Sequence, residues 1–172
     1  PPSVPELVGM PWADRNRTKK PTPTPTLDRY SRDLTQLAHD DRLHPVIGRD
    51  AILQQIARIL IQPEAKNPLL IGETGVGKTA IVEGFAYWLA RERVIPQLRH
   101  KRIVELQVSS LVSDTKYRED LEERILQILQ EVKAAPELIV FLEEIHSIIG
   151  GGTGISLKIV AAIARKEFLC IG

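Results

Sequence analysis

The sequence predicts a three-layer α/β fold, in which a central parallel sheet is covered by helices on both faces. Short apolar runs alternate along the chain with segments in which apolar residues recur at helical spacing. Strands that alternate with helices favour a parallel sheet buried on both sides. One apolar run also passes through a glycine-rich turn, residues 72–77, directly into a helical pattern. The length of 172 residues allows one domain with a modest core.

The individual elements follow from local patterns. Strands are expected at four apolar runs, 68–71, 103–108, 138–142 and 168–171. Helices are expected where apolar residues recur at intervals of three and four, namely from Ser31 as N-cap through Ala38, from Asp50 as N-cap to Pro63, from Lys78 to Leu89, at 120–132 and at 157–165.

The beginning of the chain has a different composition. Seven of the 12 prolines lie in the first 25 residues, which include most of the alternating Pro-Thr run 21–26. Such a run favours polyproline II and behaves as a semi-rigid spacer. We therefore expect residues 1–30 to form a flexible Pro/Thr-rich linker and residues 31–172 to form the globular part. The start at Pro1, without methionine, and the abrupt end at Gly172 indicate a fragment of a longer chain.

Composition argues against several classes of partner. The chain has 23 Lys and Arg against 22 Asp and Glu, and no basic tail or patch is evident. Binding to nucleic acid or anionic lipid as a main activity needs a concentrated positive charge, so neither is expected. No apolar run is close in length to the segment of about 20 residues that spans a membrane, and no signal peptide is visible. The single cysteine, Cys170, excludes an internal disulfide and fits a reducing location, which is the cytoplasm or, in a eukaryote, an organelle stroma or matrix.

Residues 72–79, with the sequence GETGVGKT, match the phosphate-binding P-loop motif G-x-x-x-x-G-K-[ST] in full. The glycines let backbone N–H groups surround phosphate oxygens at the start of a helix. Lys78 can reach the β and γ phosphates, and the Thr79 hydroxyl can bind Mg²⁺. A fortuitous glycine-rich turn is the alternative, against which the flanking strand and helix argue. The expected ATP contacts here are Gly72, Thr74, Gly75, Val76, Gly77, Lys78, Thr79 and Ala80.

Two adjacent carboxylates close the apolar run 138–142. Because P-loop ATPases hold their metal with an acidic residue at the end of a neighbouring strand, we expect Glu143 to orient Mg²⁺. Glu144 would accept a proton from the attacking water as a general base, which makes Glu144 and Lys78 the candidate catalytic residues. The alternative is that both glutamates merely begin a solvated turn.

From about Leu27 to its end, the chain resembles the first ATPase module of Clp-type AAA+ protein unfoldases and disaggregases. The resemblance implies a P-loop NTPase (AAA+) fold and ATP hydrolysis by a ring, normally a hexamer, that draws protein substrates through a central pore. A peptidase or an adaptor is a further partner that it allows. The matching segments are 34–38, 45–50, 67–68, 72–84, 116–118, 122–124, 144–146 and 170–172.

The resemblance assigns two further sets of residues. Val46, Ile47 and Gly48 would lie against adenine, and a pore loop of Lys116, Tyr117 and Arg118 would grip the substrate. An aromatic ring suits this task, because it offers a large contact area whatever side chain it meets. Taken alone, the Lys-Tyr-Arg triplet is more often an ordinary surface turn.

The chain also departs from the family pattern. Glu143 stands where the family has Asp, Glu119 replaces a glycine of the pore loop, and the segment from 146 to 170 is several residues shorter. The family's sensor residue, arginine finger and helical lid are not among the 172 residues, so the isolated chain is expected to hydrolyse ATP weakly or not at all. The alternatives are a weakly catalytic nucleotide-binding module for assembly or regulation and, more remotely, a nucleotide kinase or a DNA-dependent motor.

Overall fold

The computed structural model describes residues 20–64, 67–73, 75–143 and 154–172. The described part contains a four-stranded sheet in the order β1 (Ser31–Asp33), β2 (Arg102–Leu106), β3 (Leu138–Phe141) and β4 (Leu169–Ile171). Strands β2, β3 and β4 are parallel, with Val104 beside Val140 and Val140 beside Cys170. Strand β1 pairs antiparallel with β2. The predicted α/β architecture is confirmed, with one antiparallel edge strand that the sequence pattern did not indicate.

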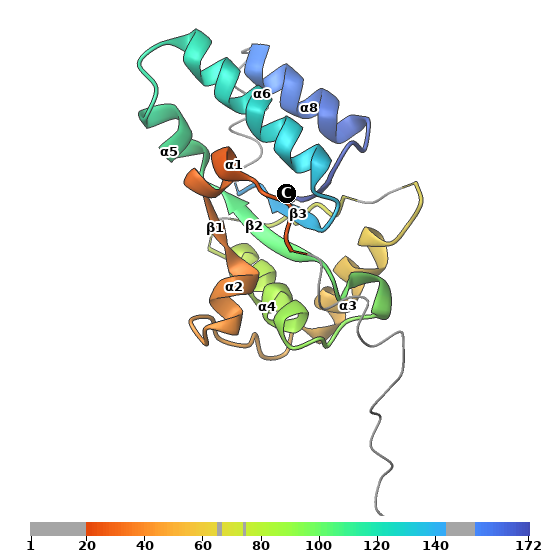
Figure 1. Ribbon diagram of the computed structural model, residues 1–172. Helices are drawn as coiled ribbons and strands as arrows, with labels where there is room; N and C mark the ends of the chain where they lie inside the picture. Colours follow the sequence, from red (N-terminus) through yellow and green to blue (C-terminus); the bar gives the residue numbers. More distant parts are fainter. Residues whose placement is uncertain (1–19, 65–66, 74, 144–153) are drawn as a thin grey trace, which may run out of the picture.

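Helices cover both faces of the sheet (Figure 1). One face carries α2 (Leu34–His39), α3 (Asp50–Leu60) and α4 (Lys78–Ala90), followed by the 3₁₀ turn η1 (Pro96–Leu98). The opposite face carries α5 (Val108–Ser113), α6 (Arg118–Ala134) and α8 (Gly154–Ala164), with α1 (Pro25–Arg29) beside α6. None of the helices in the described ranges is long and apolar enough to cross a membrane.

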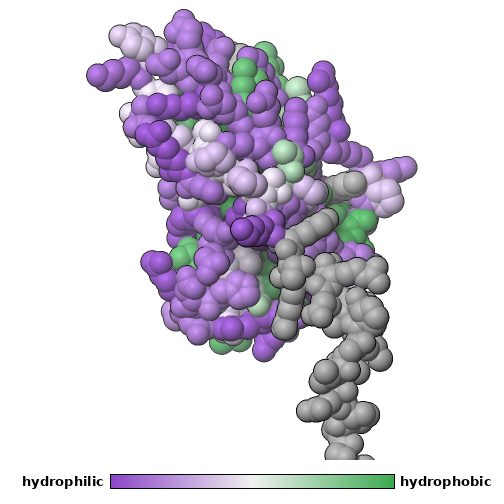
Figure 2. Space-filling view, viewed as in Figure 1, coloured by the Kyte–Doolittle hydropathy of each residue, from purple (hydrophilic) through white to green (hydrophobic). Residues whose placement is uncertain are grey.

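The central strand shows why its sequence is apolar throughout. Ile139 and Phe141 belong to the core beneath α3 and α4, whereas Leu138 and Val140 belong to the core beneath α6 and α8. Alternate residues of a strand point to opposite faces, so a strand buried on both faces needs apolar residues at every position. By contrast, the outer face in Figure 2 is mostly hydrophilic, with its hydrophobic residues in separate patches.

Residues 20–30 are packed onto the domain, which differs from the expected linker over residues 1–30. Leu27 is fully buried, and the backbone amides of Thr26 and Leu27 donate to the Glu131 carboxylate of α6 at 3.0 and 2.9 Å. Pro25 occupies the first position of α1, where its fixed φ suits a helix and its missing N–H is not needed. The Pro-Thr run therefore ends in a helix start. Residues 1–19 lie outside the described part.

Two predicted helix caps lie elsewhere in the structure. Ser31 is in strand β1, and Asp33 caps α2 by accepting the N–H of Gln36 at 2.9 Å. The antiparallel pairing with β2 takes up Ser31, so the helix begins at the next side chain that can cap it. Asp50 is the first residue of α3, whereas Arg49 takes the N-cap position.

The expected buried strand at 68–71 is not formed as a regular strand. Leu70 N–H donates to Gly172 O at 2.6 Å, and Gly172 N–H donates to Pro68 O at 3.2 Å, so the segment lies beside the end of β4. Within the described part, these two bonds are the only backbone hydrogen bonds that it makes to another strand. With a neighbour on one side, Leu69 and Ile71 remain exposed, the latter by 89%.

Candidate functional site

The glycine-rich loop lies between segment 68–71 and the first residue of α4. Gly75 has φ +87° and Gly77, the N-cap of α4, has φ +91°. Both values lie in the left-handed region that favours glycine. The loop therefore delivers the chain to a helix N-terminus, where the first N–H groups have no partner within the helix and favour a bound anion.

The same loop closes on itself. A Cβ atom at Gly72 would lie 2.7 Å from Cγ2 of Val76, so glycine is needed at this position. The Lys78 ammonium donates to Gly72 O at 2.8 Å and lies back across the loop. The Lys78 side chain thus reaches back to the first residue of the motif. Thr74, another expected contact, lies outside the described residues.

The first turn of α4 meets the end of β3. The Thr79 hydroxyl donates to Glu143 Oε1 at 2.5 Å. Glu143 follows Leu142, whose N–H donates to Ile171 O at 2.8 Å and continues the pairing of β3 with β4. The structure therefore brings together the hydroxyl and the carboxylate that the sequence proposed for Mg²⁺, although Glu has one methylene more than the family's Asp. The other expected acid, Glu144, lies outside the described residues.

Gly84 explains how segment 46–48 reaches α4. A Cβ atom at Gly84 would lie 2.7 Å from Cγ2 of Val46, so the bare helix surface lets Val46 pack directly on it. Ile47 is 92% exposed, and Gly48 has φ +73°. The sequence did not give Gly84 a role of its own. A glycine inside a helix is unfavourable by about 1 kcal/mol relative to alanine, and this was the available signal of a close approach.

Lys116, Tyr117 and Arg118 lie at a separate place, on the turn from α5 into α6 (Figure 1). The Tyr117 side chain is 68% exposed and precedes the first residue of α6. Arg118 pairs with Glu122 at 3.5 Å. The turn thus offers an aromatic ring and a basic group to solvent, away from the glycine-rich loop.

The residues that meet at the loop fit a magnesium-bound nucleotide. Hydroxyl and carboxylate oxygens, such as those of Thr79 and Glu143, are ligands of the hard type that Mg²⁺ prefers. No group of three or more His, Cys, Asp and Glu residues in the described ranges could hold a metal ion. Mg²⁺ usually keeps waters and is shared with substrate phosphates, so one carboxylate and one hydroxyl suffice on the protein side.

Known proteins resemble this chain in sequence. Residues 68–165 match the model of the ATPase family associated with various cellular activities (AAA). The chain is 40% identical to the ATP-binding subunit ClpC of the ATP-dependent Clp protease from Staphylococcus aureus, over 91% of this chain and 20% of the relative. The identity to ClpC of Staphylococcus epidermidis is also 40%, over 98% and 22%.

Solved structures agree as well. The ADP complex of Hsp104 from S. cerevisiae has a TM-score of 0.77 and 34% identity, covering 85% of this chain and 21% of that one. A closed state of Hsp104 with ATPγS and FITC casein has a TM-score of 0.78, covering 86% and 26%. The chain thus spans about a fifth of the length of the curated relatives that it matches. The chain belongs to the AAA family of ATPases.

Proposed function

We propose that this chain is the ATP-binding and ATP-hydrolysing module of a Clp-type protein-remodelling chaperone. The observation that carries the proposal is the contact between Thr79 and Glu143, which joins the first turn of the P-loop helix to the end of β3. It sets a hydroxyl and a carboxylate beside Lys78, whose ammonium reaches back to Gly72 of the loop. This is the donor set that a magnesium-bound triphosphate needs.

The residues take separate roles in this proposal. The backbone of the loop, Lys78 and the start of α4 would hold the phosphates, while Thr79 and Glu143 would hold Mg²⁺. When bound, the ion would neutralise charge on the phosphate oxygens. Glu144 would accept the proton of the attacking water. The exposed Ile47 beside α4 would cover adenine, together with Val46 and Gly48.

Coupling to polypeptide movement is part of the same proposal. The exposed Tyr117, flanked by Lys116 and Arg118, would contact a substrate chain in a ring of subunits, with a hexamer as the expected assembly. Support comes from the Hsp104 structures, one of which contains casein, and from the ClpC relatives, which are named as subunits of a protease. A peptidase or adaptor partner and a cytoplasmic location complete the proposal.

The test is the variant Glu144→Gln in the longer protein that contains this module. ATP turnover should fall by about 10²-fold or more, because the general base is lost, whereas ATP binding should survive. Glu64→Gln is the matched control, since Glu64 is an exposed glutamate beyond the end of α3. Turnover unchanged in Glu144→Gln would overturn the assignment.

A second candidate is a weakly catalytic module that uses nucleotide for assembly or regulation. It is favoured by Glu143 in place of Asp and by Glu119, which adds negative charge beside Tyr117. A carboxylate misplaced by about 1 Å can reduce rate by about 100-fold. Turnover in the longer protein should therefore rise in Glu143→Asp if this candidate is right. It should not rise if Glu143 already positions Mg²⁺ for efficient hydrolysis.

A further inference from the structure

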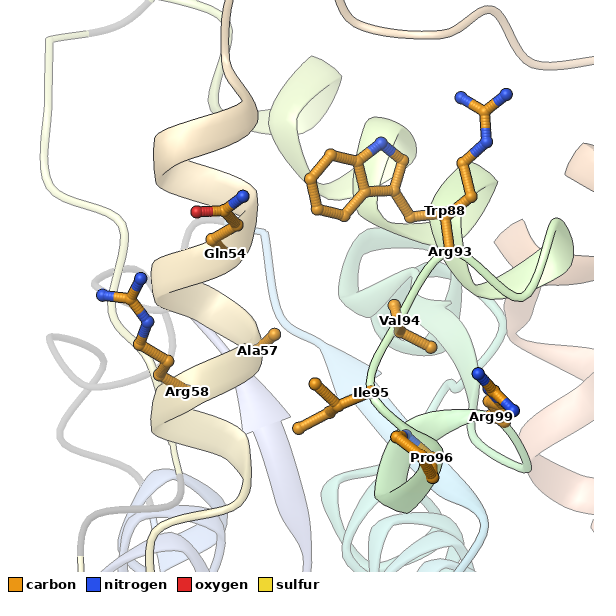
Figure 3. A pocket seen from close by; sticks show the side chains of 9 residues that line it. All are labelled: Gln54, Ala57, Arg58, Trp88, Arg93, Val94, Ile95, Pro96 and Arg99. Atoms are coloured by element: carbon orange, nitrogen blue, oxygen red, sulfur yellow. The ribbon is translucent and has the colours of Figure 1, made fainter.

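A cleft lies between α3 and the segment that follows α4, away from the glycine-rich loop. Its volume is about 540 Å³. In Figure 3, Ile95 points across it toward Ala57 of α3, and the Trp88 ring extends toward the same helix. Its floor is apolar and consists of Ala57, Trp88, Val94, Ile95 and Pro96. We call it the arginine cleft, after the residues at its rim.

Three exposed arginines stand around this floor. Arg58 comes from α3, whereas Arg93 and Arg99 come from the opposite wall. Within the described residues, none of the three guanidinium groups has an ion pair or hydrogen bond. Their neighbours in the chain differ, because Arg91 pairs with Asp41 and Arg102 pairs with Asp33 at 2.7 Å. The cleft therefore combines unpaired positive charge with an apolar floor, although the whole chain has a net charge of only +1.

The arrangement of the arginines narrows the choice of ligand. In Figure 3 the three guanidinium groups point in different directions from separate parts of the rim and do not converge on one point. A small anion such as phosphate is bound by donors that converge on it. Carboxylates spaced along a polypeptide would meet separated guanidinium groups, while an apolar side chain of the same polypeptide would enter the floor.

The residues of the floor also favour a peptide over a nucleic acid as the ligand. Trp88 could stack on a base, but four of the five floor residues are aliphatic. Aliphatic surface suits a Leu- or Phe-sized anchor better than successive bases. Nucleic-acid binding also takes most of its affinity from neutralising many phosphates, for which three separated arginines are few.

We propose that the arginine cleft is a docking site for an acidic segment of a partner protein that carries an apolar anchor residue. The segment would set its carboxylates against Arg58, Arg93 and Arg99 and its anchor against Trp88 and Ile95. The cleft lies at the C-terminal end of α4, which contributes Trp88, whereas Lys78 and Thr79 are in the first turn of that helix. Docking can therefore occur independently of nucleotide.

Binding is measured with a fluorescein-labelled synthetic peptide that combines Asp and Glu with Leu and Phe, against the 172-residue chain. The variant Arg58→Glu/Arg99→Glu should weaken binding by about tenfold or more, since each reversal replaces an attraction by a repulsion. Arg165→Glu is the matched control, because Arg165 is an exposed arginine at the end of α8 that does not line the cleft. Equal weakening in the control, or none in the double variant, would overturn the proposal.

Two further probes test the chemistry of the ligand. A peptide with Asn and Gln in place of the acids, and an acidic peptide without Leu and Phe, should each bind at least several-fold more weakly than the parent. A labelled single-stranded DNA of similar length should bind more weakly still. Equal binding of the neutral peptide would leave only an apolar groove, and tighter binding of DNA would make the cleft a nucleic-acid site. Either result would refute the proposal.

A spectroscopic measurement places the ligand in the cleft itself. The chain has two tryptophans, Trp12 and Trp88, so Trp12→Phe leaves Trp88 as the single reporter. Binding of unlabelled peptide should shift Trp88 emission to the blue as water is displaced. Ile95→Gln should weaken both the shift and the affinity, because Ile95 is 37% exposed and contributes to the floor. Peptide binding without any change in Trp88 emission would contradict docking at this site.

Discussion

The Tyr30 hydroxyl donates a 2.6 Å hydrogen bond to Asp114 Oδ2, and so ties the segment before β1 to the end of α5. Arg124 of α6 donates to the Tyr30 oxygen at 2.5 Å and to Asp114 at 2.9 Å. Asp114 precedes the turn that carries Tyr117, and Arg124 follows it. The three side chains therefore close the base of that turn and hold its two flanking helices together.

This triangle sets the ionisation of Asp114. The hydrogen bond from Tyr30, followed by that from Arg124, lowers the pKa of Asp114 below its ordinary value of 3.8. In Tyr30→Phe the ring remains but the largest of these causes is lost, so the pKa of Asp114 should rise toward 3.8. A carboxyl NMR titration measures it. Arg29→Ala is the control and should change this pKa less, because Arg29 lies 3.6 Å from Asp114 and is exposed.

The same shift predicts how stability depends on pH. A carboxyl group whose pKa is lower in the folded chain stabilises the fold above the pKa of the unfolded chain. That contribution is lost as the pH falls through the lower folded-state pKa. The difference in free energy of unfolding between the parent chain and Asp114→Asn should therefore be full at neutral pH and shrink below pH 3.8. A difference that stays constant down to this range would contradict the role of the ionised form.

The contact between Thr79 and Glu143 predicts a magnesium-specific defect. Glu143→Gln keeps the shape of the side chain and removes its charge, so ATP affinity in the presence of Mg²⁺ should fall by about 10- to 100-fold. Affinity measured with a chelator present should stay the same. Thr79→Val should give the same pattern through loss of the hydroxyl. Equal losses with and without Mg²⁺ would show instead that the contact supports the fold of the loop.

The close approach of Val46 to Gly84 predicts an unusual response to alanine. Alanine in place of glycine normally stabilises a helix interior by about 1 kcal/mol. Gly84→Ala should instead lower the free energy of unfolding, because its Cβ would lie 2.7 Å from Cγ2 of Val46. Displacement of segment 46–48 should also weaken ATP binding several-fold. Urea unfolding and an ATP titration measure the two effects.

A compensating variant tests whether steric overlap with Val46 causes the losses expected in Gly84→Ala. Val46→Ala/Gly84→Ala removes the Cγ2 atom that would be closest, so it should recover part of both losses relative to Gly84→Ala. Unchanged stability in the single variant, or no recovery in the double one, would argue against packing of Val46 on α4 as the reason for glycine.

The sequence predicted those helices and strands whose own pattern of apolar residues is sufficient to define them. Strand β3 and helices α4 and α6 were expected because apolar spacing alone indicates their buried faces. The meeting of Thr79 with Glu143 was also expected, since parallel strands end at the same edge of a sheet, although β4 lies between segment 68–71 and β3. For the strand and the two helices, the information needed lies within each segment.

The remaining features depend on partners that are distant in sequence. Strand β1 forms because Ser31 pairs with Leu106, and Leu27 is buried in the core beside α6, where Glu131 accepts the N–H groups at the start of α1. Segment 68–71 has a strand-like sequence but makes its backbone hydrogen bonds on the side of β4. The arginine cleft gathers residues from α3 and from the stretch after α4. The number of charged residues in the sequence could not show that these arginines lie around one cleft, nor that they have no ion pairs within the described residues.

Cys170 provides a test of nucleotide binding that does not depend on hydrolysis. Its thiol lies buried in β4 beside Val140, and burial raises the pKa of Cys170 to about 12. Since the thiolate is the reactive form, alkylation at neutral pH should require unfolding of the chain. A ligand that binds only the folded state reduces the unfolded fraction. ATP with Mg²⁺ at about 100 times its Kd should therefore slow alkylation about 100-fold, provided that refolding is faster than labelling.

The variant Lys78→Ala supplies the control for this experiment. Its alkylation rate without nucleotide should be close to that of the parent chain, because the hydrogen bond that the Lys78 ammonium donates goes to the exposed Gly72. Its rate should not respond to ATP, because the phosphates lose the cation that holds them. Rapid alkylation of the native parent chain would contradict the burial of Cys170. A nucleotide effect that persists in Lys78→Ala would place the binding site elsewhere than the glycine-rich loop.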